Sequence, residues 1–309
     1  MTTMPPADEA IRRAYLQHLT PRDLALLTGA PAAAAGAAPD LATHLAGFPG
    51  GLEGRLGDPA VFDALFGPPG EGEPLVGASP FLAFAVAVHR CAHELASMSY
   101  VSEWLGPGRH APVFDVAQLR SFLDVGRNRF FLAELLHSYT HVASGSVFVR
   151  TRRGLRRQRF SELDPVRLAG LLDVVSETER PGILRRLGDL ALFLTGVFPD
   201  YVSRRGFAPI EEGRLLRAGG MADGRREAGA PGAAMVEAAG PGGAVGLLEL
   251  LGTRWYRAAF VLLPRPVPED VAVIADLPAH FGQARRILGL ITERFLFHQR
   301  DRWFGPREA

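Results

Sequence analysis

The chain contains no lysine, so all 34 of its basic residues are arginine. A phosphate-binding lysine of the Walker type, a Schiff-base lysine and a lysine that holds pyridoxal phosphate are therefore excluded. A GC-rich genome, which also favours Ala, Gly and Pro codons, is a sufficient cause of this bias. The three lysine chemistries are excluded whatever the cause.

Cysteine is almost as scarce, because Cys91 is the only one in the 309 residues. An internal disulfide, a cysteine-rich zinc site and an iron–sulfur cluster all require more than one thiol. Cys91 lies within an apolar run, which is more typical of a thiol in the core than of a nucleophile.

Long hydrophobic runs are absent as well. The most apolar stretch, PFLAFAVAV at 80–88, is too short to cross the ~30 Å hydrocarbon core of a bilayer. The N-terminal MTTMPPADEAIRRAY has no apolar core and does not have the pattern of a signal peptide. We therefore predict a cytoplasmic protein that does not enter a membrane.

Strand-like alternation is rare, whereas helix starts are well marked. A side chain that can cap a helix directly precedes proline at Thr20, Asp58, Ser79 and Asp164, and proline already has a helical φ angle. Helices are predicted over 6–18, 21–28, 58–66, 80–105, 116–124, 127–143, 165–175, 179–197, 243–263 and 278–300. Shorter helical pieces are predicted near 39–46, 209–218 and 268–275.

The one strand signal is SVFVRTRRGLRRQRF at 146–160, which predicts the only hairpin of the chain. Residues 29–39 and 219–243 are rich in Gly and Ala without apolar periodicity, and they are predicted to be mobile.

The predicted fold class is therefore mainly α, an irregular multi-helix body with one basic β-hairpin and a C-terminal helical pair. The body is expected over 1–205, with the hairpin at 146–160. A flexible Gly/Ala-rich segment is expected over 206–242, and C-terminal helices that pack on the body are expected over 243–309.

Two segments place histidine residues four apart, His89 with His93 and His137 with His141, and Glu134 precedes His137 by three. Residues at this spacing share a helix face and can chelate a metal ion, here a divalent transition metal. The Glu-x-x-His spacing recurs in di-iron carboxylate bundles, but those sites need a second such motif, which is missing.

The helical wheel separates the two histidine pairs. His89 and His93 fall among apolar and aromatic residues, so each needs a partner, which a carboxylate, a backbone carbonyl or a metal can supply. The alternatives for this pair are ordinary hydrogen-bonded histidine, the lining of a ligand pocket and metal ligation. His137 and His141 fall on a polar face, where solvation is the simpler interpretation. A four-histidine cluster forms only if the two helices turn these faces together.

The stretch 146–160 holds six arginines and no acid, so the rest of the chain carries −5 within a total of +1. With a two-residue turn at Arg153-Gly154, strand alternation places four arginines on one face. These are Arg150, Arg152, Arg157 and Arg159. Arg150 would then lie directly opposite Arg157, an unfavourable arrangement that something anionic should compensate.

Three sources can supply the compensating negative charge: acids of the same chain, an acidic protein surface, or a nucleic acid or phosphorylated ligand. Phe148 and Phe160 are the only aromatic residues of the hairpin, which is few for a protein that stacks on single-stranded bases. No helix-turn-helix, RNA-recognition or zinc-finger signature is present. An acidic protein is therefore favoured over nucleic acid as the partner.

Two functions follow from these patterns. The first is a non-catalytic helical binding or scaffold protein that uses the arginine-rich hairpin to contact an acidic partner. The alternative is a metal-dependent helical oxidase or hydrolase whose site is built from His89, His93, Glu134, His137 and His141. The sequence indicates no catalytic residue, no other cofactor and no oligomeric state.

Overall fold

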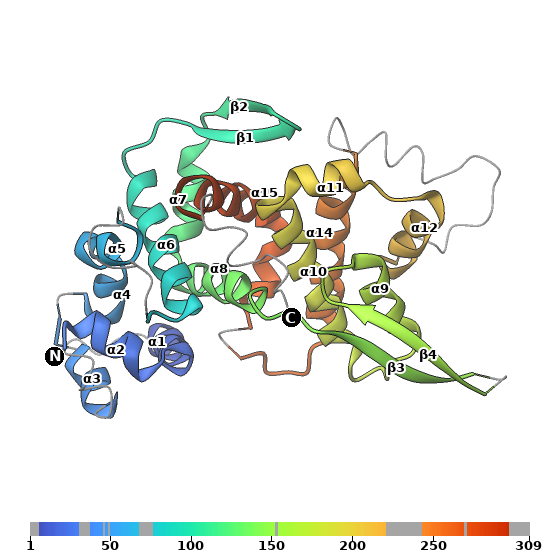
Figure 1. Ribbon diagram of the computed structural model, residues 1–309, viewed down its shortest axis with the longest axis horizontal. Helices are drawn as coiled ribbons and strands as arrows, with labels where there is room; N and C mark the ends of the chain where they lie inside the picture. The colour runs from blue at the N-terminus through green and yellow to red at the C-terminus, as the bar shows by residue number, and fades with distance from the viewer. Residues whose placement is uncertain are drawn as a thin grey trace. The chain divides into compact units, whose positions relative to one another are not determined.

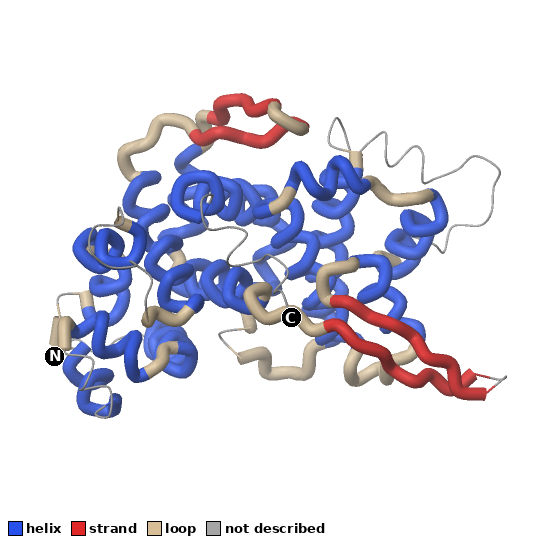
Figure 2. The backbone as a smooth tube through the Cα atoms, viewed as in Figure 1, coloured by secondary structure: helices blue, strands red, loops and turns tan. Residues whose placement is uncertain are grey.

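The computed structural model describes residues 6–30, 38–45, 47–48, 50–67, 77–151, 154–220, 243–268 and 271–296. For 6–7, 38–39, 147–151 and 154–159 it describes the backbone alone. The fold is mainly helical, at 71%, with 14 helices and two small two-stranded antiparallel sheets among these residues (Figure 2). The predicted mainly α fold class is confirmed.

The chain divides into two compact units. Unit 1 comprises Met1–Val101, Phe114–Thr140 and Leu290–Ala309, and unit 2 comprises Ser102–Val113 and His141–Gly289. The predicted segments ending at 205 and 242 stay a prediction, since residues 221–242 lie outside the described part of the chain.

Unit 1 is built around one buried helix, α6. Its helices are α1 (Pro6–His18), α2 (Pro21–Thr28), α3 (Ala38–Leu45), α4 (Gly51–Leu56), α5 (Pro59–Phe66), α6 (Pro80–Leu95), α7 (Val116–Asp124) and α8 (Gly126–Ser138), with a π-helical turn at Thr292–Leu296. Every residue of α6 from Phe81 to His89 is buried, and α8 packs along it (Figure 1). A helix that is apolar on all sides is typical of the centre of a core.

The predicted caps explain where α2, α5 and α6 begin. The hydroxyl of Thr20 accepts from the N–H of Asp23, and the Asp23 carboxylate accepts from the N–H of Thr20 at 2.8 Å. The other oxygen of Asp23, which is fully buried, accepts from the N–H of Ser79 at 2.8 Å. One carboxylate therefore joins the starts of α2 and α6, and it satisfies N–H groups that a helix start otherwise leaves without a partner.

Unit 2 contains both hairpins and the longest helices. Its elements are β1 (Val101–Gly106), β2 (Arg109–Val113), β3 (Ser144–Thr151), β4 (Gly154–Ser161), α9 (Pro165–Ala169), a 3-10 turn (Gly170–Asp173), α10 (Arg180–Val197), α11 (Pro199–Arg205), α12 (Pro209–Ala218), α14 (Ala244–Leu262) and α15 (Val273–Ile291). Val101 and the last two residues of α15 belong to unit 1. Helices α10 and α14 lie side by side in Figure 1 and form the main helix pair of the unit.

Small residues allow the helices of unit 2 to approach closely. A Cβ atom on Gly188 of α10 would lie 2.8 Å from the ring of Tyr256 on α14. A Cβ atom on Gly252 of α14 would lie 2.6 Å from the ring of Phe281 on α15 and 2.9 Å from the Cβ atom of Ala191. Since ordinary carbon contacts are longer than this, these glycines are required by packing.

We expect Gly188→Ala to lower the free energy of unfolding of unit 2 by about 1–2 kcal/mol, because overpacking costs more than the gain in helix propensity. Gly182→Ala, on the same helix, is the matched control: nothing lies within 4 Å of its Cβ position, so it should stabilise by about 0.5–1 kcal/mol. Urea unfolding followed by tryptophan fluorescence measures both. Equal effects of the two substitutions would contradict the close packing at Gly188.

The prediction of a single hairpin is wrong, because β1 and β2 form a second one. The sequence predicts a helix over 80–105 that includes residues 101–105, but α6 ends at Leu95. Arg120 donates to the carbonyl oxygens of Leu95 at 2.6 Å and Met98 at 2.8 Å, which stabilises the end of the helix. The local signal for this hairpin is the Pro-Gly turn at 107–108, since β2 (RHAPV) has only one β-branched residue, Val113.

The predicted bounds of two other helices are also wrong. Helix α8 stops at Ser138 and not at 143, where the hydroxyl groups of Ser138 and Thr140 donate back to main-chain carbonyls. Helix α15 already begins at Val273 and includes Pro278, so the separately predicted piece at 268–275 belongs partly to it. Most of the predicted mobile segments lies outside the described residues.

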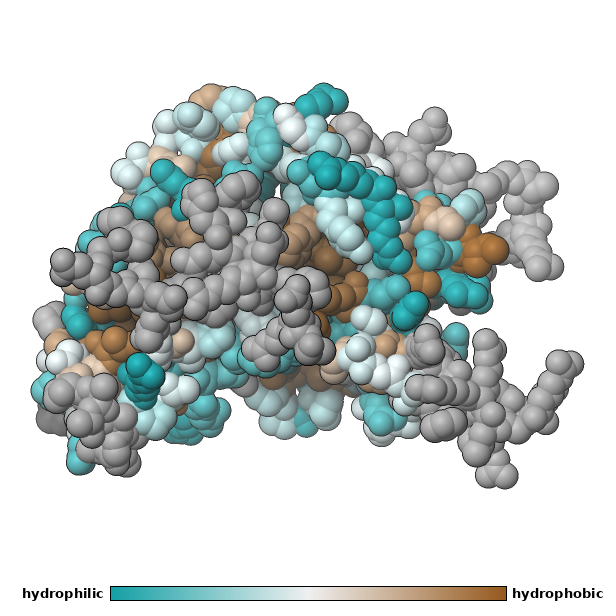
Figure 3. Space-filling model, in the orientation of Figure 1, coloured by the Kyte–Doolittle hydropathy of each residue, from teal (hydrophilic) through white to brown (hydrophobic). Residues whose placement is uncertain are grey.

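Within the described ranges, no helix has the length and apolar character needed to cross a bilayer. Figure 3 shows hydrophobic and hydrophilic residues interspersed on its visible face. The most exposed large hydrophobic side chains, Phe114, Ile210 and Val261, come from three different parts of the chain. Phe114 lies beside the exposed Tyr100, with ring centroids 5.9 Å apart, and Val261 precedes the exposed Leu262. Exposed hydrophobic residues in groups this small are ordinary at protein surfaces.

Candidate functional site

The basic hairpin is present, but its register differs from the predicted one. Thr151 pairs with Gly154, Arg150 with Leu155, and Arg157 with Phe148. Gly154 therefore belongs to β4, and the predicted turn at Arg153-Gly154 is wrong. The predicted opposition of Arg150 and Arg157 is wrong for the same reason. Arg152 lies outside the described residues.

The register is set at the root of the hairpin. The N–H of Glu162 donates to the carbonyl of Ala143 at 3.1 Å, and the N–H of Ala143 donates to Oε2 of Glu162 at 3.0 Å. This pair continues the same ladder that joins Ser144 to Ser161. The observed register therefore agrees with the contacts at the root and not with the local Arg-Gly turn signal.

Glu162 also ties this root to the helical part of unit 2. Its Oε2 atom accepts from Nη2 of Arg186, on α10, at 3.2 Å. Both side chains are largely buried, so the contact is better protected from solvent than an ordinary surface ion pair. The hairpin therefore projects from a fixed base.

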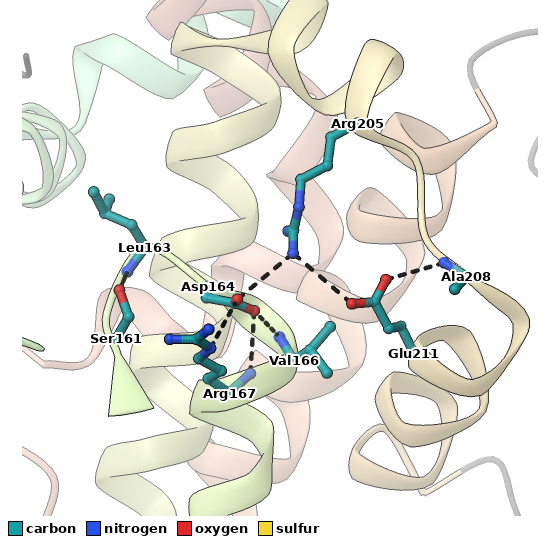
Figure 4. A network of polar contacts seen from close by, with 8 residues as sticks. All are labelled: Ser161, Leu163, Asp164, Val166, Arg167, Arg205, Ala208 and Glu211. Carbon is teal, nitrogen blue, oxygen red and sulfur yellow. Dashed lines mark hydrogen bonds and ion pairs between the residues drawn. The ribbon is translucent and has the colours of Figure 1, made fainter. Parts of the chain in front are cut away.

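The junction between β4 and α9 is fixed by a second carboxylate, Asp164 (Figure 4). Its Oδ1 atom caps α9 by accepting from the N–H groups of Val166 at 3.0 Å and Arg167 at 3.2 Å. Figure 4 shows Arg205, from α11, between Asp164 and Glu211, at 3.5 Å and 3.9 Å respectively. Glu211 in turn caps α12 by accepting from the N–H of Ala208.

These contacts show how the acids next to the hairpin in sequence are used. Glu162 pairs with Arg186, and Asp164 pairs with Arg167 and Arg205. All three arginines lie outside the hairpin. The first two carboxylates after the hairpin therefore already neutralise cations of the helical part of unit 2.

The first histidine pair is split by its environment. His89 is 7% exposed, and its Nε2 atom lies 3.3 Å from the hydroxyl oxygen of Tyr15, on α1. Burial, with a smaller effect from Arg129, lowers the pKa of His89 to about 3. His93 on the same helix is exposed. His89 is therefore a neutral core histidine whose partner is a tyrosine, which the sequence had not suggested.

The second pair is also divided. The ring of His137 packs against Phe81 and His18, with centroid distances of 5.8 Å and 6.0 Å. His141 lies beyond the end of α8 and is exposed, so the two residues do not share a helix face. His18 was missed, although it falls on the apolar face of α1, three residues after Tyr15.

The five proposed metal ligands all lie in described ranges. In this part of the chain no three His, Cys, Asp or Glu side chains are grouped so that they could hold a metal ion. Glu134 is half-buried on α8. Among the described residues, the five proposed ligands are therefore not gathered into one metal-binding group.

Two other buried groups that could ionise occupy the cores. Cys91 is buried in unit 1, and burial raises the pKa of its thiol, which agrees with its interpretation as a core residue. In unit 2, the hydroxyl of Tyr256 donates to the buried Asp189 at 2.8 Å. Burial raises the pKa of Asp189, although Arg185, Arg186 and the Tyr256 hydrogen bond oppose the shift.

The comparisons with known proteins give no further assignment: the chain matches no family model, no curated protein and no solved structure.

Proposed function

We propose that the chain is a non-catalytic binding protein whose hairpin β3–β4 contacts an acidic partner, which is a protein surface in preference to a nucleic acid. One observation carries this proposal. A stretch with six arginines and no acid folds as an antiparallel hairpin on a root fixed in unit 2.

The charge of the hairpin is permanent, because arginine stays protonated in proteins. Its planar guanidinium group binds carboxylates through two parallel hydrogen bonds. The nearest acids in sequence, Glu162 and Asp164, accept from arginines of the helical part of unit 2. These two acids already pair with arginines outside the hairpin. A partner that bears carboxylates would therefore supply negative charge to the arginines of the hairpin.

We expect the double substitution Arg150→Gln and Arg157→Gln to leave the melting temperature of the protein nearly unchanged. It should weaken binding to poly-glutamate at least five-fold, because two cations that attract carboxylates are removed. The matched control is Arg254→Gln with Arg257→Gln, which removes the same charge from exposed positions of α14. Calorimetry for stability and fluorescence anisotropy for binding provide the two measurements.

Salt dependence distinguishes the partners. Poly-glutamate binding should weaken between 0.1 M and 1 M salt, as the Debye length falls from ~10 Å to ~3 Å. Duplex DNA should show a steeper logarithmic slope if it is the preferred ligand, approaching ~0.9 per phosphate contacted. A large loss of stability in the hairpin variant, together with equal binding by both double variants, would show that the arginines are paired inside the fold.

A further inference from the structure

The two units carry opposite net charges. Unit 2 contains 22 arginines and 17 Asp or Glu residues, whereas unit 1 contains 12 arginines and 16 Asp or Glu residues. Six of the 22 arginines lie in the stretch 146–160, so unit 2 without its hairpin is close to neutral. The positive excess of the chain is thus located in the hairpin, and the negative excess is located in unit 1.

Five aspartates carry negative charge on the surface of unit 1. All are exposed, and among the described residues none of them forms an ion pair: Asp8, Asp40, Asp63, Asp115 and Asp124. Asp8 and Asp40 lie in the first turns of α1 and α3, where a carboxylate stabilises the start of the helix. Asp124 is the last residue of α7. The helix dipole disfavours a carboxylate at that end, so the charge of Asp124 does not stabilise its own helix.

Two of these aspartates lie at the ends of α7, next to two exposed aromatic rings. Asp115 directly precedes α7, and its side chain makes no capping hydrogen bond. Phe114 is 73% exposed, and its ring centroid lies 5.9 Å from that of Tyr100, which is 51% exposed. The one arginine of α7, Arg120, donates to two main-chain carbonyl groups and pairs with neither aspartate. We call Tyr100, Phe114, Asp115 and Asp124 the α7 surface.

The groups of the α7 surface suit a guanidinium group. A carboxylate accepts two parallel hydrogen bonds from arginine, and an aromatic ring stacks on its flat face. The α7 surface offers both kinds of contact within one part of unit 1. The hairpin offers six arginines and no acid. The hairpin and the α7 surface are therefore complementary in charge and in the contacts that they can make.

We propose that the acidic partner of the hairpin is a second copy of this chain, whose α7 surface receives the arginines. This inference rests on the proposed binding function and names its partner. The hairpin and the α7 surface belong to different units, so each contact between two copies leaves one hairpin and one α7 surface unused. Such head-to-tail association continues until it closes into a ring or grows into an open chain.

The first measurement is the average mass of the purified chain by analytical ultracentrifugation. At 0.1 M salt we expect the mass to rise with protein concentration from that of the 33.3 kDa monomer. At 1 M salt it should return to the monomer value, because screening shortens the Debye length from ~10 Å to ~3 Å.

Charge reversal tests which surfaces meet. The variant with Arg150→Glu and Arg157→Glu should not self-associate, because its acidic hairpin meets an acidic α7 surface. The variant with Asp115→Arg and Asp124→Arg should not self-associate either, because both of its surfaces are basic. When the two variants are mixed, each surface again meets its opposite. We expect the mixture to associate at least ten-fold more tightly than either variant alone.

Two matched controls accompany these variants. Arg254→Glu with Arg257→Glu has the same net charge as the hairpin variant, but the changes lie at exposed positions of α14, so it should self-associate as the wild type does. Phe114→Ser, which changes no charge, should weaken association at least three-fold. Ile210→Ser, at a residue of unit 2 that is also 73% exposed, should leave association unchanged.

The outcomes separate this inference from the proposed function. A chain that stays monomeric at every concentration but still binds poly-glutamate through its hairpin would overturn the second copy as partner and leave the proposed function in place. Association that the mixture does not restore, or equal effects of Phe114→Ser and Ile210→Ser, would overturn the α7 surface. If neither self-association nor poly-glutamate binding is observed, the binding function itself is wrong.

Discussion

Replacing Glu103 by Gln is expected to lower the free energy of unfolding of unit 2 by about 3 kcal/mol, because it removes a buried carboxylate that pairs with two partly buried guanidinium groups. Glu103 lies on β1 and is 8% exposed. Its two oxygens pair with Arg285 and Arg286 of α15. Glutamine keeps the size of the side chain but removes the negative charge between two guanidinium groups.

Glu249→Gln is the matched control for Glu103→Gln. Glu249 also pairs with Arg285, at 3.3 Å, but its side chain is 35% exposed. Water can solvate Arg285 where the Glu249 carboxylate is removed, so the free energy of unfolding should fall by less than about 1 kcal/mol. Urea unfolding followed by the fluorescence of Trp104 and Trp255, both in unit 2, measures the two variants. Similar losses would mean that burial does not strengthen the Glu103 contacts.

Glu103 also explains why the β1–β2 hairpin could not be predicted. Through Glu103, strand β1 contacts Arg285 of α15, more than 180 residues away in sequence. The indole N–H of Trp104, also on β1, donates to Asp200 at 2.7 Å. Read locally, residues 101–105 continued the apolar stripe of the preceding helix. Pairing that depends on distant residues leaves only a weak local signal, here the turn at Pro107-Gly108.

Helix starts were predictable because their causes are local. Thr20, Ser79 and Asp164 each accept from an N–H group two or three residues later, so a window of four residues contains the whole interaction. The same holds for the strands of the basic hairpin. Its register was not predictable, because Ala143 and Glu162 set it from outside the arginine-rich stretch.

The histidine residues show the same division. The position of His89 on an apolar stripe predicted burial and the need for a partner, and both hold. The identity of the partner, Tyr15, depends on how α1 packs in unit 1. His137 was placed on a polar face, but Phe81 and His18 cover its ring. Spacing alone shows which residues share a helix face and does not show what lies opposite that face.

We expect unit 1 to lose stability in mild acid because of His89. Burial lowers the pKa of this histidine from 6.5 to about 3, so below pH 6.5 the unfolded chain takes up a proton that the folded chain does not. Stability therefore falls as the pH falls from 6.5 toward 3. At about 1.4 kcal/mol per pH unit, His89 alone should cost about 2 kcal/mol between pH 7 and pH 5.

His89→Gln tests this expectation, because glutamine can still form a hydrogen bond with Tyr15 and does not titrate. Relative to the wild type, the variant should gain about 2 kcal/mol in going from pH 7 to pH 5, whatever its stability at pH 7. His93→Gln, on the same helix but at an exposed position, should show no such gain. The free energy of opening at each pH can be measured by hydrogen exchange of the α6 amides. The carboxylates are the same in both proteins, so their contributions to the acid dependence cancel in the comparison. If His89→Gln loses as much stability in acid as the wild type, His89 must become protonated within the folded protein.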